Sequence, residues 1–166
     1  MKISREDFVQ AATDIWKNHG VYWWGGNGES TESITLKKIR TGEQSTFDFI
    51  RVIFYILLCY LKDWDMSKSQ MVDCSGLVVS ILRQLKAISS VDDYRAKELQ
   101  AMCKAVKLTK LNPGDLVFNK KSDATHVGIY VGYDMVIESQ GRLYGVTKRQ
   151  LSEGSWKIGG VLPYFE

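Results

Sequence analysis

The 166-residue sequence has few cysteines, and their spacing is not that of a metal site or a disulfide scaffold. Cys59, Cys74 and Cys103 form no Cys-x-x-Cys pair, and neither histidine lies near them in the sequence. Structural zinc sites use closely spaced pairs of such residues, and an odd number of cysteines leaves one thiol unpaired. We therefore expect no metal and no cofactor, and a chain that folds without disulfides.

The sequence also lacks an apolar run long enough to cross a bilayer, which takes about 20 residues. Residues 1–7 contain no apolar core of a secretory signal peptide, so we expect a protein that is made in the cytoplasm without one. The apolar residues 47–61 are bounded by charges such as Asp48 and Lys62. We interpret them as a helix that is either buried or in contact with another protein chain, and we predict no membrane span.

Repeats, low-complexity linkers and a strong charge of one sign are absent as well. The fractions of hydrophobic residues (45%) and charged residues (25%) are those of an ordinary globular domain. The net charge of +3 fits an anionic partner and an ordinary solvated surface equally well, and we expect no nucleic-acid partner. The length and even composition predict one domain, residues 1–166.

The most informative pattern is residues 72–79, Val-Asp-Cys-Ser-Gly-Leu-Val-Val. Apolar residues recur at helical spacing from Leu77 to Ile88, which predicts a helix with Cys74 in its first turn. A helix N-terminus favours the thiolate of a cysteine, and its free N–H groups can hold the oxyanion that follows attack on a carbonyl. Gly76 leaves room for a substrate or another segment. The alternative is that Cys74 is a small buried hydrophobic residue, as free cysteines usually are.

The remaining pattern changes from helical to strand periodicity near residue 111. Ser4 and Ser45 are predicted to cap helices over residues 8–16 and 47–61, and Asp92 or Asp93 a shorter helix through residues 94–106. The first helix is expected to stop at Gly20, with His19 in a capping or surface role, and the polar residues 27–44 are interpreted as a loop. The predicted strands are 116–118, 126–131, 135–138, 142–147 and 157–165, with a hairpin turn at 132–134. This order predicts an α+β fold, with helices first and then an antiparallel sheet of about five strands.

A cysteine nucleophile needs a base and a third group that orients the base. His126 stands at the start of an apolar strand, where it is either that base or a hydrogen-bonded core residue. Glu138 on the next strand is the candidate for the third group, with Ser139 and Gln140 as rivals. Glu138 is otherwise a solvated charge at a strand end.

The hairpin register decides whether Glu138 can reach His126. A two-residue turn puts Glu138 opposite Ile129, too far along the strand from His126. One extra residue in the loop puts it opposite Gly128, which is diagonal to His126 on the same face of the sheet. The sequence leaves both registers open.

Four motifs follow one another along the chain: Tyr22-Trp23-Trp24-Gly25-Gly26, Asp73-Cys74-Ser75-Gly76, Pro113-Gly114-Asp115-Leu116-Val117-Phe118 and His126-Val127-Gly128-Ile129-Tyr130-Val131-Gly132. In this order they resemble the motifs of the NlpC-type cell-wall cysteine peptidases. The resemblance implies a papain-like fold in which the nucleophile helix packs on the antiparallel sheet.

The same resemblance implies a role for each matching residue. Cys74 is the nucleophile, His126 the base, and Glu138 stands where the family has a polar third residue, often His, Asn or Gln. A carboxylate there is a departure, although it can also orient an imidazole. Tyr22 is an oxyanion or substrate contact. Asp73 and Ser75 line the substrate cleft, where Asp73 could hold the free amine of a stem peptide.

A second departure is the length between the Gly-Gly and Asp-Cys motifs, which makes residues 27–72 an insertion. This insertion covers the cleft, docks a protein partner on the helix of residues 47–61, or extends the core.

The implied function is a cysteine endopeptidase that hydrolyses peptidoglycan stem peptides through an acyl-enzyme, between D-glutamate and the following diamino acid. Because no signal peptide is expected, we predict action at the cell wall as part of a phage tail, as a lysis protein, or after delivery by another machine. The alternatives are a non-catalytic assembly or binding module with the same fold, and an amidase that acts on another amide.

Overall fold

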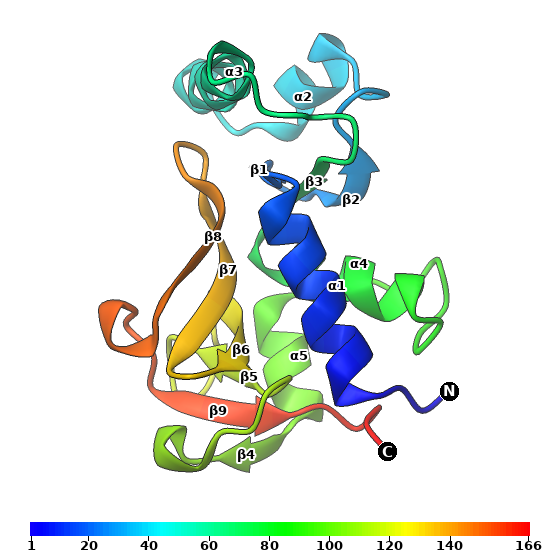
Figure 1. The fold of residues 1–166 in the computed structure, drawn as a ribbon, viewed down its shortest axis with the longest axis vertical. Coiled ribbons are helices and arrows are strands. Elements are labelled where there is room, and N and C mark those ends of the chain that lie inside the picture. The colour runs from blue at the N-terminus through cyan, green and yellow to red at the C-terminus, as the bar shows by residue number, and fades with distance from the viewer.

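Helix α4 (Cys74–Gln84) is the central helix of the fold in the computed structural model, which describes residues 1–166. Helix α1 (Arg5–Lys17) packs against α4, and the large sheet packs on α4 as well. Figure 1 shows α1, α4 and α5 (Ala96–Met102) together on one side of that sheet. The apolar side chains of α4 that are fully buried in the main core are Leu77, Val78, Ile81 and Leu82. The predicted helix with Cys74 in its first turn is therefore confirmed.

The large sheet has six strands in the order β4-β9-β5-β6-β7-β8, and all neighbours are antiparallel. Its strands are β4 (Lys104–Val106), β5 (Leu116–Phe118), β6 (Val127–Gly132), β7 (Met135–Gly141), β8 (Gly145–Gln150) and β9 (Ile158–Val161). Short 3-10 helices, η1 (Leu108–Lys110) and η2 (Leu151–Glu153), lie in the connections. The predicted papain-like α+β fold is confirmed. The sixth strand arises because residues 104–106 pair with β9 and do not continue the helix before them.

Two predicted details of this half of the molecule are wrong. The strand expected over residues 142–147 begins only at Gly145, because the residues before it form the turn of the β7–β8 hairpin, and it continues to Gln150. Helix α5 begins after Arg95 and is not capped by Asp92 or Asp93. The carbonyl oxygen of Asp92 instead accepts two hydrogen bonds from the guanidinium of Arg83, which fixes the α4–α5 connection.

Besides the predicted helix over residues 47–61, residues 27–72 contain regular structure that the sequence did not indicate. Strand β2 (Asn27–Ser30) pairs with β3 (Gln70–Val72), which also pairs with β1 (Val21–Tyr22) in a second sheet. Helix α2 (Leu36–Gly42) is capped by Thr35. The prediction of a loop over residues 27–44 is therefore wrong. The helix was missed because α2 buries only one apolar residue, Ile39, so its sequence has no detectable helical periodicity.

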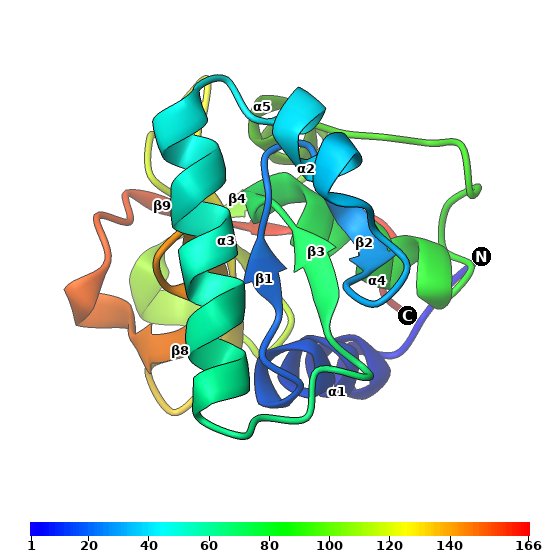
Figure 2. The same cartoon turned by 90° about the horizontal axis from the view of Figure 1, so that it is seen from above.

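Helix α3 (Thr46–Leu61) lies on the outside of the molecule, above β1 and β3 in Figure 1 and beside β1 in the view of Figure 2. The predicted cap by Ser45 is confirmed, because its hydroxyl accepts from the Asp48 amide at 3.1 Å. Only Val52, Tyr55 and Cys59 of this helix are buried, in a second small core. Helix α3 is therefore only partly buried. None of the helices has the length and apolar character needed to cross a membrane.

The end of α1 differs from the predicted stop at Gly20. The residue in the left-handed conformation is His19, with φ of 57°, and the Gly20 amide donates back to Ile15 at 3.1 Å. The imidazole of His19 stacks on the ring of Trp64, with centroids 3.9 Å apart. Burial lowers the pKa of His19. This histidine is therefore a structural residue at the base of the insertion, away from Cys74.

Candidate active site

The first turn of α4 presents Cys74 beside a loop of the second sheet. Asp73 is the N-cap of α4, and its Oδ1 accepts from the Gly76 amide at 2.7 Å and the Ser75 hydroxyl at 3.1 Å. Its Oδ2 accepts from the Gly25 amide at 3.0 Å. A Cβ at Gly76 would lie 1.8 Å from the carbonyl oxygen of Gly26. The segment that approaches Gly76 closely, as predicted, is therefore the Gly25–Gly26 loop of the same chain. This contact packs the loop tightly against the first turn of α4.

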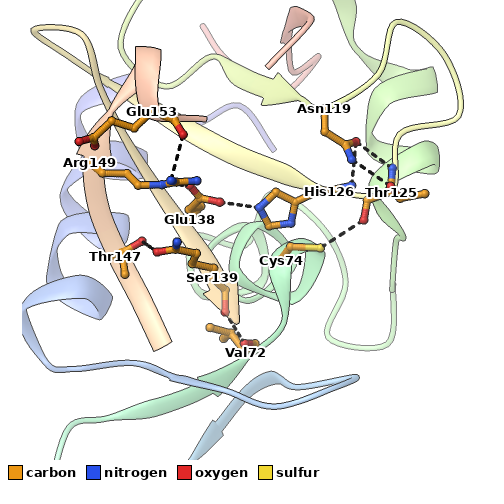
Figure 3. Close-up of polar contacts among 11 residues, drawn as sticks. Val72, Cys74, Asn119, Thr125, His126, Glu138, Ser139, Thr147, Arg149 and Glu153 are labelled. Atoms are coloured by element: carbon orange, nitrogen blue, oxygen red, sulfur yellow. Dashed lines mark hydrogen bonds and ion pairs between the residues drawn. The ribbon is translucent and has the colours of Figure 1, made fainter. Parts of the chain in front are cut away.

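Strand β6 brings His126 to Cys74. The two side chains lie side by side in Figure 3, and the proximity of the Cys74 sulfur helps to raise the pKa of His126. The Cys74 Sγ also lies 3.9 Å from the carbonyl oxygen of Thr125. The Oδ1 of Asn119 accepts from the backbone amides of both Thr125 and His126, at 3.1 and 3.0 Å. Asn119 therefore fixes the backbone that aims the imidazole at the sulfur.

Glu138 holds the other side of the imidazole. Its Oε2 lies 2.5 Å from Nε2 of His126, which leaves Nδ1 for Cys74. The strands have the register with one extra loop residue, because Ile129 pairs with Ile137 and the pairing shifts before Gly132. Glu138 is thus opposite Gly128 and diagonal to His126.

The rival third residues make other hydrogen bonds. The Ser139 hydroxyl is buried and donates to the carbonyl oxygen of Val72 at 2.7 Å. The Oε1 of Gln140 accepts from the hydroxyl of Thr147 at 3.1 Å. Among the three candidates, the structure therefore brings only Glu138 to the imidazole.

Besides Asn119, two residues of this site were missed by sequence reasoning. Arg149 on β8 donates from Nε to Oε1 of Glu138 at 2.6 Å and from Nη1 to the carbonyl oxygen of Glu153 at 3.1 Å. The ring of Trp156 stacks on His126, with centroids 5.5 Å apart and planes 13° apart. The predicted β8 ended at Thr147, two residues before Arg149. A longer strand would have placed Arg149 on the face of Glu138, because Glu138 pairs with Thr147.

The charges of the site favour a protonated imidazole and an ionised carboxylate. Burial alone would lower the pKa of His126, but the hydrogen bonds and charges of Cys74 and Glu138 outweigh it and raise the pKa to about 9. Burial alone would raise the pKa of Glu138, but His126 and Arg149 outweigh it and lower the pKa. The carboxylate side chain is 1% exposed and therefore depends on both cations. The set is built to hold an imidazolium next to a sulfur at neutral pH.

A cleft of about 680 Å³ opens over Cys74 and His126. Tyr22, Asp73 and Ser75, the predicted substrate contacts, all line it, and Gln140 does too. Burial, above all, raises the pKa of Tyr22, so its hydroxyl stays protonated and can donate a hydrogen bond. Both oxygens of Asp73 already accept bonds from within the protein. Asp73 therefore shapes the cleft wall first, and contact with a substrate amine would use its remaining lone pairs.

The site combines a cysteine, a histidine and a carboxylate, which are the residue types that a cysteine nucleophile and its base require. No group of three or more His, Cys, Asp or Glu side chains is arranged as metal ligands. The amides of Cys74 and Ser75 in the first turn of α4 have no acceptor within the helix, whereas that of Gly76 donates to Asp73. This arrangement defines the class of papain-like cysteine proteins.

The family model described as the NlpC/P60 family matches residues 62–160, more than half of the chain. The chain therefore belongs to the NlpC/P60 family, which confirms the resemblance seen in the motifs. The match begins after α3, so most of residues 27–72 lie outside it. A comparison with curated proteins finds no match.

Several solved structures share the fold at low sequence identity. The NlpC/p60 domain of the peptidoglycan hydrolase SagA is 15% identical with a TM-score of 0.61, over 96% of this chain and 100% of that one. The P60 domain of an antigen from Mycobacterium avium subspecies paratuberculosis is 15% identical with a TM-score of 0.60, over 98% of each chain. RipD from Mycobacterium tuberculosis, described as a non-catalytic NlpC/p60 protein adapted to peptidoglycan binding, is 12% identical with a TM-score of 0.61, over 98% of this chain and 99% of that one. These likenesses concern the fold.

Proposed function

We propose that this protein is a cysteine endopeptidase that hydrolyses amide bonds in peptidoglycan stem peptides. The observation that carries the proposal is the set formed by Cys74, His126 and Glu138: the sulfur at a helix N-terminus, the imidazole beside it, and a buried carboxylate 2.5 Å from Nε2. The set opens to a cleft large enough for a peptide. Membership of the NlpC/P60 family, in which SagA is described as a peptidoglycan hydrolase, supports the choice of substrate.

The reaction follows from where the protons and charges lie. The Cys74 thiolate attacks the carbonyl carbon of the scissile amide, and the negative oxygen is held by the Cys74 amide and the Tyr22 hydroxyl. The protonated Nδ1 of His126 then donates its proton to the leaving nitrogen, so that the amine departs and a thioester remains on Cys74. His126, now neutral, takes a proton from water, which attacks the thioester and releases the carboxylic acid and the thiolate. Glu138 keeps the imidazole in the orientation that these steps need.

The bond we propose is the one between D-glutamate and the diamino acid of the stem peptide. The support for this choice is the family resemblance of the Tyr22, Asp73 and Ser75 motifs, all of which line the cleft. Cleavage there leaves L-alanyl-D-glutamate on the muramic acid and frees the amino group of the diamino acid. An amidase that acts on another amide would use the same catalytic set and release different products.

Digestion of purified muropeptides tests the proposal directly. The native protein, under reducing conditions, is expected to produce new amino termini at the diamino acid, and Cys74→Ala to produce none. Cys103→Ala is the matched control, because Cys103 is a half-buried thiol outside the cleft. New amino termini at another position would show that the protein cleaves a different bond. No new termini with any stem-peptide type, from protein that binds the muropeptides, would favour a non-catalytic binding module.

A further inference from the structure

The outer face of α3 carries an uncovered apolar stripe that the proposed reaction does not use. Its members recur at intervals of three and four residues and are all at least half exposed: Phe47 (61%), Ile50 (55%), Phe54 (52%), Leu57 (54%) and Leu61 (80%). Tyr60, on the same face, is 56% exposed. Figure 2 shows the whole length of α3 uncovered on this side. A globular protein seldom leaves so many large apolar side chains together in water without a partner.

The spacing of the stripe identifies the kind of partner. Apolar residues at alternating intervals of three and four form the seam along which one helix packs against another. The buried face of α3, formed by Val52, Tyr55 and Cys59, is already used against the second core. The seam is therefore a second packing face on the same helix, and a helix with matching intervals fits it.

We propose that the partner is a second copy of this chain, with the two α3 helices packed against each other about a twofold axis. Identical seams match each other when they run in opposite directions, and twofold dimers are the commonest oligomers of soluble proteins. Residues 27–72 contain six acidic and six basic side chains, so the segment that carries the seam adds no net charge of its own to the contact between two copies. This charge balance provides no cationic rim of the kind that holds a helix on an anionic lipid surface.

The exposed area agrees with a reversible dimer. Six large side chains that are about half exposed leave roughly 600 Å² of apolar surface on each copy, or roughly 1,200 Å² in the pair. That is the lower limit of stable protein interfaces, which predicts a dimer that dissociates on dilution.

Sedimentation equilibrium of the full chain tests the proposal. At a protein concentration of about 100 μM, the native protein is expected to be a dimer. This concentration is well above the micromolar dissociation constant typical of such interfaces. Phe54→Glu and Leu57→Glu are expected to give monomers, because they place a charge in the seam and keep a good helix former there. Val91→Glu is the matched control, since Val91 is 83% exposed on the α4–α5 connection and should leave the dimer intact.

A second measurement keeps the test independent of how the variants fold. Hydrogen–deuterium exchange of the native α3 amides is expected to slow at high protein concentration relative to low, with α1 unchanged. A native protein that stays monomeric at about 100 μM would overturn the proposal, whether it binds lipid vesicles or captures another protein. A dimer that persists in folded Phe54→Glu and Leu57→Glu would overturn it too.

Discussion

His126 immediately precedes β6 and Glu138 lies on the neighbouring strand β7, and their Nε2 and Oε2 atoms are 2.5 Å apart although the two residues are not directly paired. The contact exists because the β6–β7 hairpin holds one extra residue, which shifts the pairing before Gly132. Glu138 is thereby placed diagonal to His126 on the same face of the sheet. A single residue of register thus decides whether the imidazole has an orienting carboxylate.

Replacing that carboxylate should remove most of the activity. Glu138→Gln keeps the shape of the side chain but leaves Arg149 without its partner and His126 without its charge, so we expect kcat to fall by about 10²- to 10⁴-fold. The pKa of His126 should fall toward the ordinary value of 6.5, because one of the two groups that raise it is lost. Titration of the imidazole by NMR measures this fall. An unchanged His126 pKa with unchanged kcat would show that Glu138 is only structural.

Arg149 should act on the reaction through Glu138. Arg149→Met removes one of the two cations that lower the pKa of the Glu138 carboxyl, and we expect the acid limb of the kcat/KM profile to move to higher pH. Arg149→Lys restores the charge and should move the limb back, although it cannot reproduce both hydrogen bonds of the guanidinium. A lower melting temperature in both variants with an unmoved pH profile would indicate a purely structural role.

The stability of the fold should depend on pH through His126. Its pKa is raised from 6.5 to about 9 in the folded protein, so the protonated ring stabilises the fold fully below pH 6.5. This contribution, at most about 3 kcal/mol, is lost as the pH rises through about 9. Urea unfolding from pH 6 to 10 should show a steeper loss for the native protein than for His126→Asn. Parallel curves would contradict the raised pKa.

Cys74 should react with iodoacetamide before the other two thiols. Burial raises the pKa of Cys59, which is fully buried, and burial raises that of Cys103 to about 12. Cys74 lies in the cleft beside a histidine that is protonated at neutral pH. We expect at least about tenfold faster labelling of Cys74 at pH 7, measured by peptide mass spectrometry. Equal rates for Cys74 and Cys103 would argue against an activated thiol.

Gly76 should not tolerate even a methyl group. The Cβ of Gly76→Ala would meet the Gly26 carbonyl oxygen, which also accepts from the Asp73 amide at 3.0 Å, so the loop has to move. We expect a loss of several kcal/mol, about 2 to 4, in unfolding free energy together with slower labelling of Cys74. Ser75→Ala, one residue away, is the control and should change stability by less than about 1 kcal/mol. Equal effects of the two substitutions would contradict the close packing.

The parts of the fold with a strong period were predictable. The helix from Cys74 has apolar residues on one face for three turns. The helix caps at Ser4 and Ser45 were predicted correctly, because a serine three residues before an acidic residue is typical of a helix N-terminus. From the sequence, two registers of the hairpin were possible, and only one of them places Glu138 near His126. The structure has that register, with an irregularity in the pairing at Gly132.

The parts that depend on tertiary contacts were not predictable. Strand β2 and helix α2 are polar segments that are ordered by β3 and by the small core around Ile39. Arg149 lies beyond the predicted end of its strand, and Trp156 reaches His126 only because the chain turns back after β8. The pairing of β2 with β3 and the stacking of Trp156 on His126 join segments far apart in the sequence, for which local patterns carry no signal, whereas Arg149 was missed because the predicted strand was too short.

Mass spectrometry of purified muropeptides after incubation with the native protein and with Cys74→Ala tests the central claim most directly. The account predicts products cut between D-glutamate and the diamino acid with the native protein and intact muropeptides with Cys74→Ala. Products that form at the same rate with both proteins would contradict it, because hydrolysis would then not depend on the Cys74 thiol.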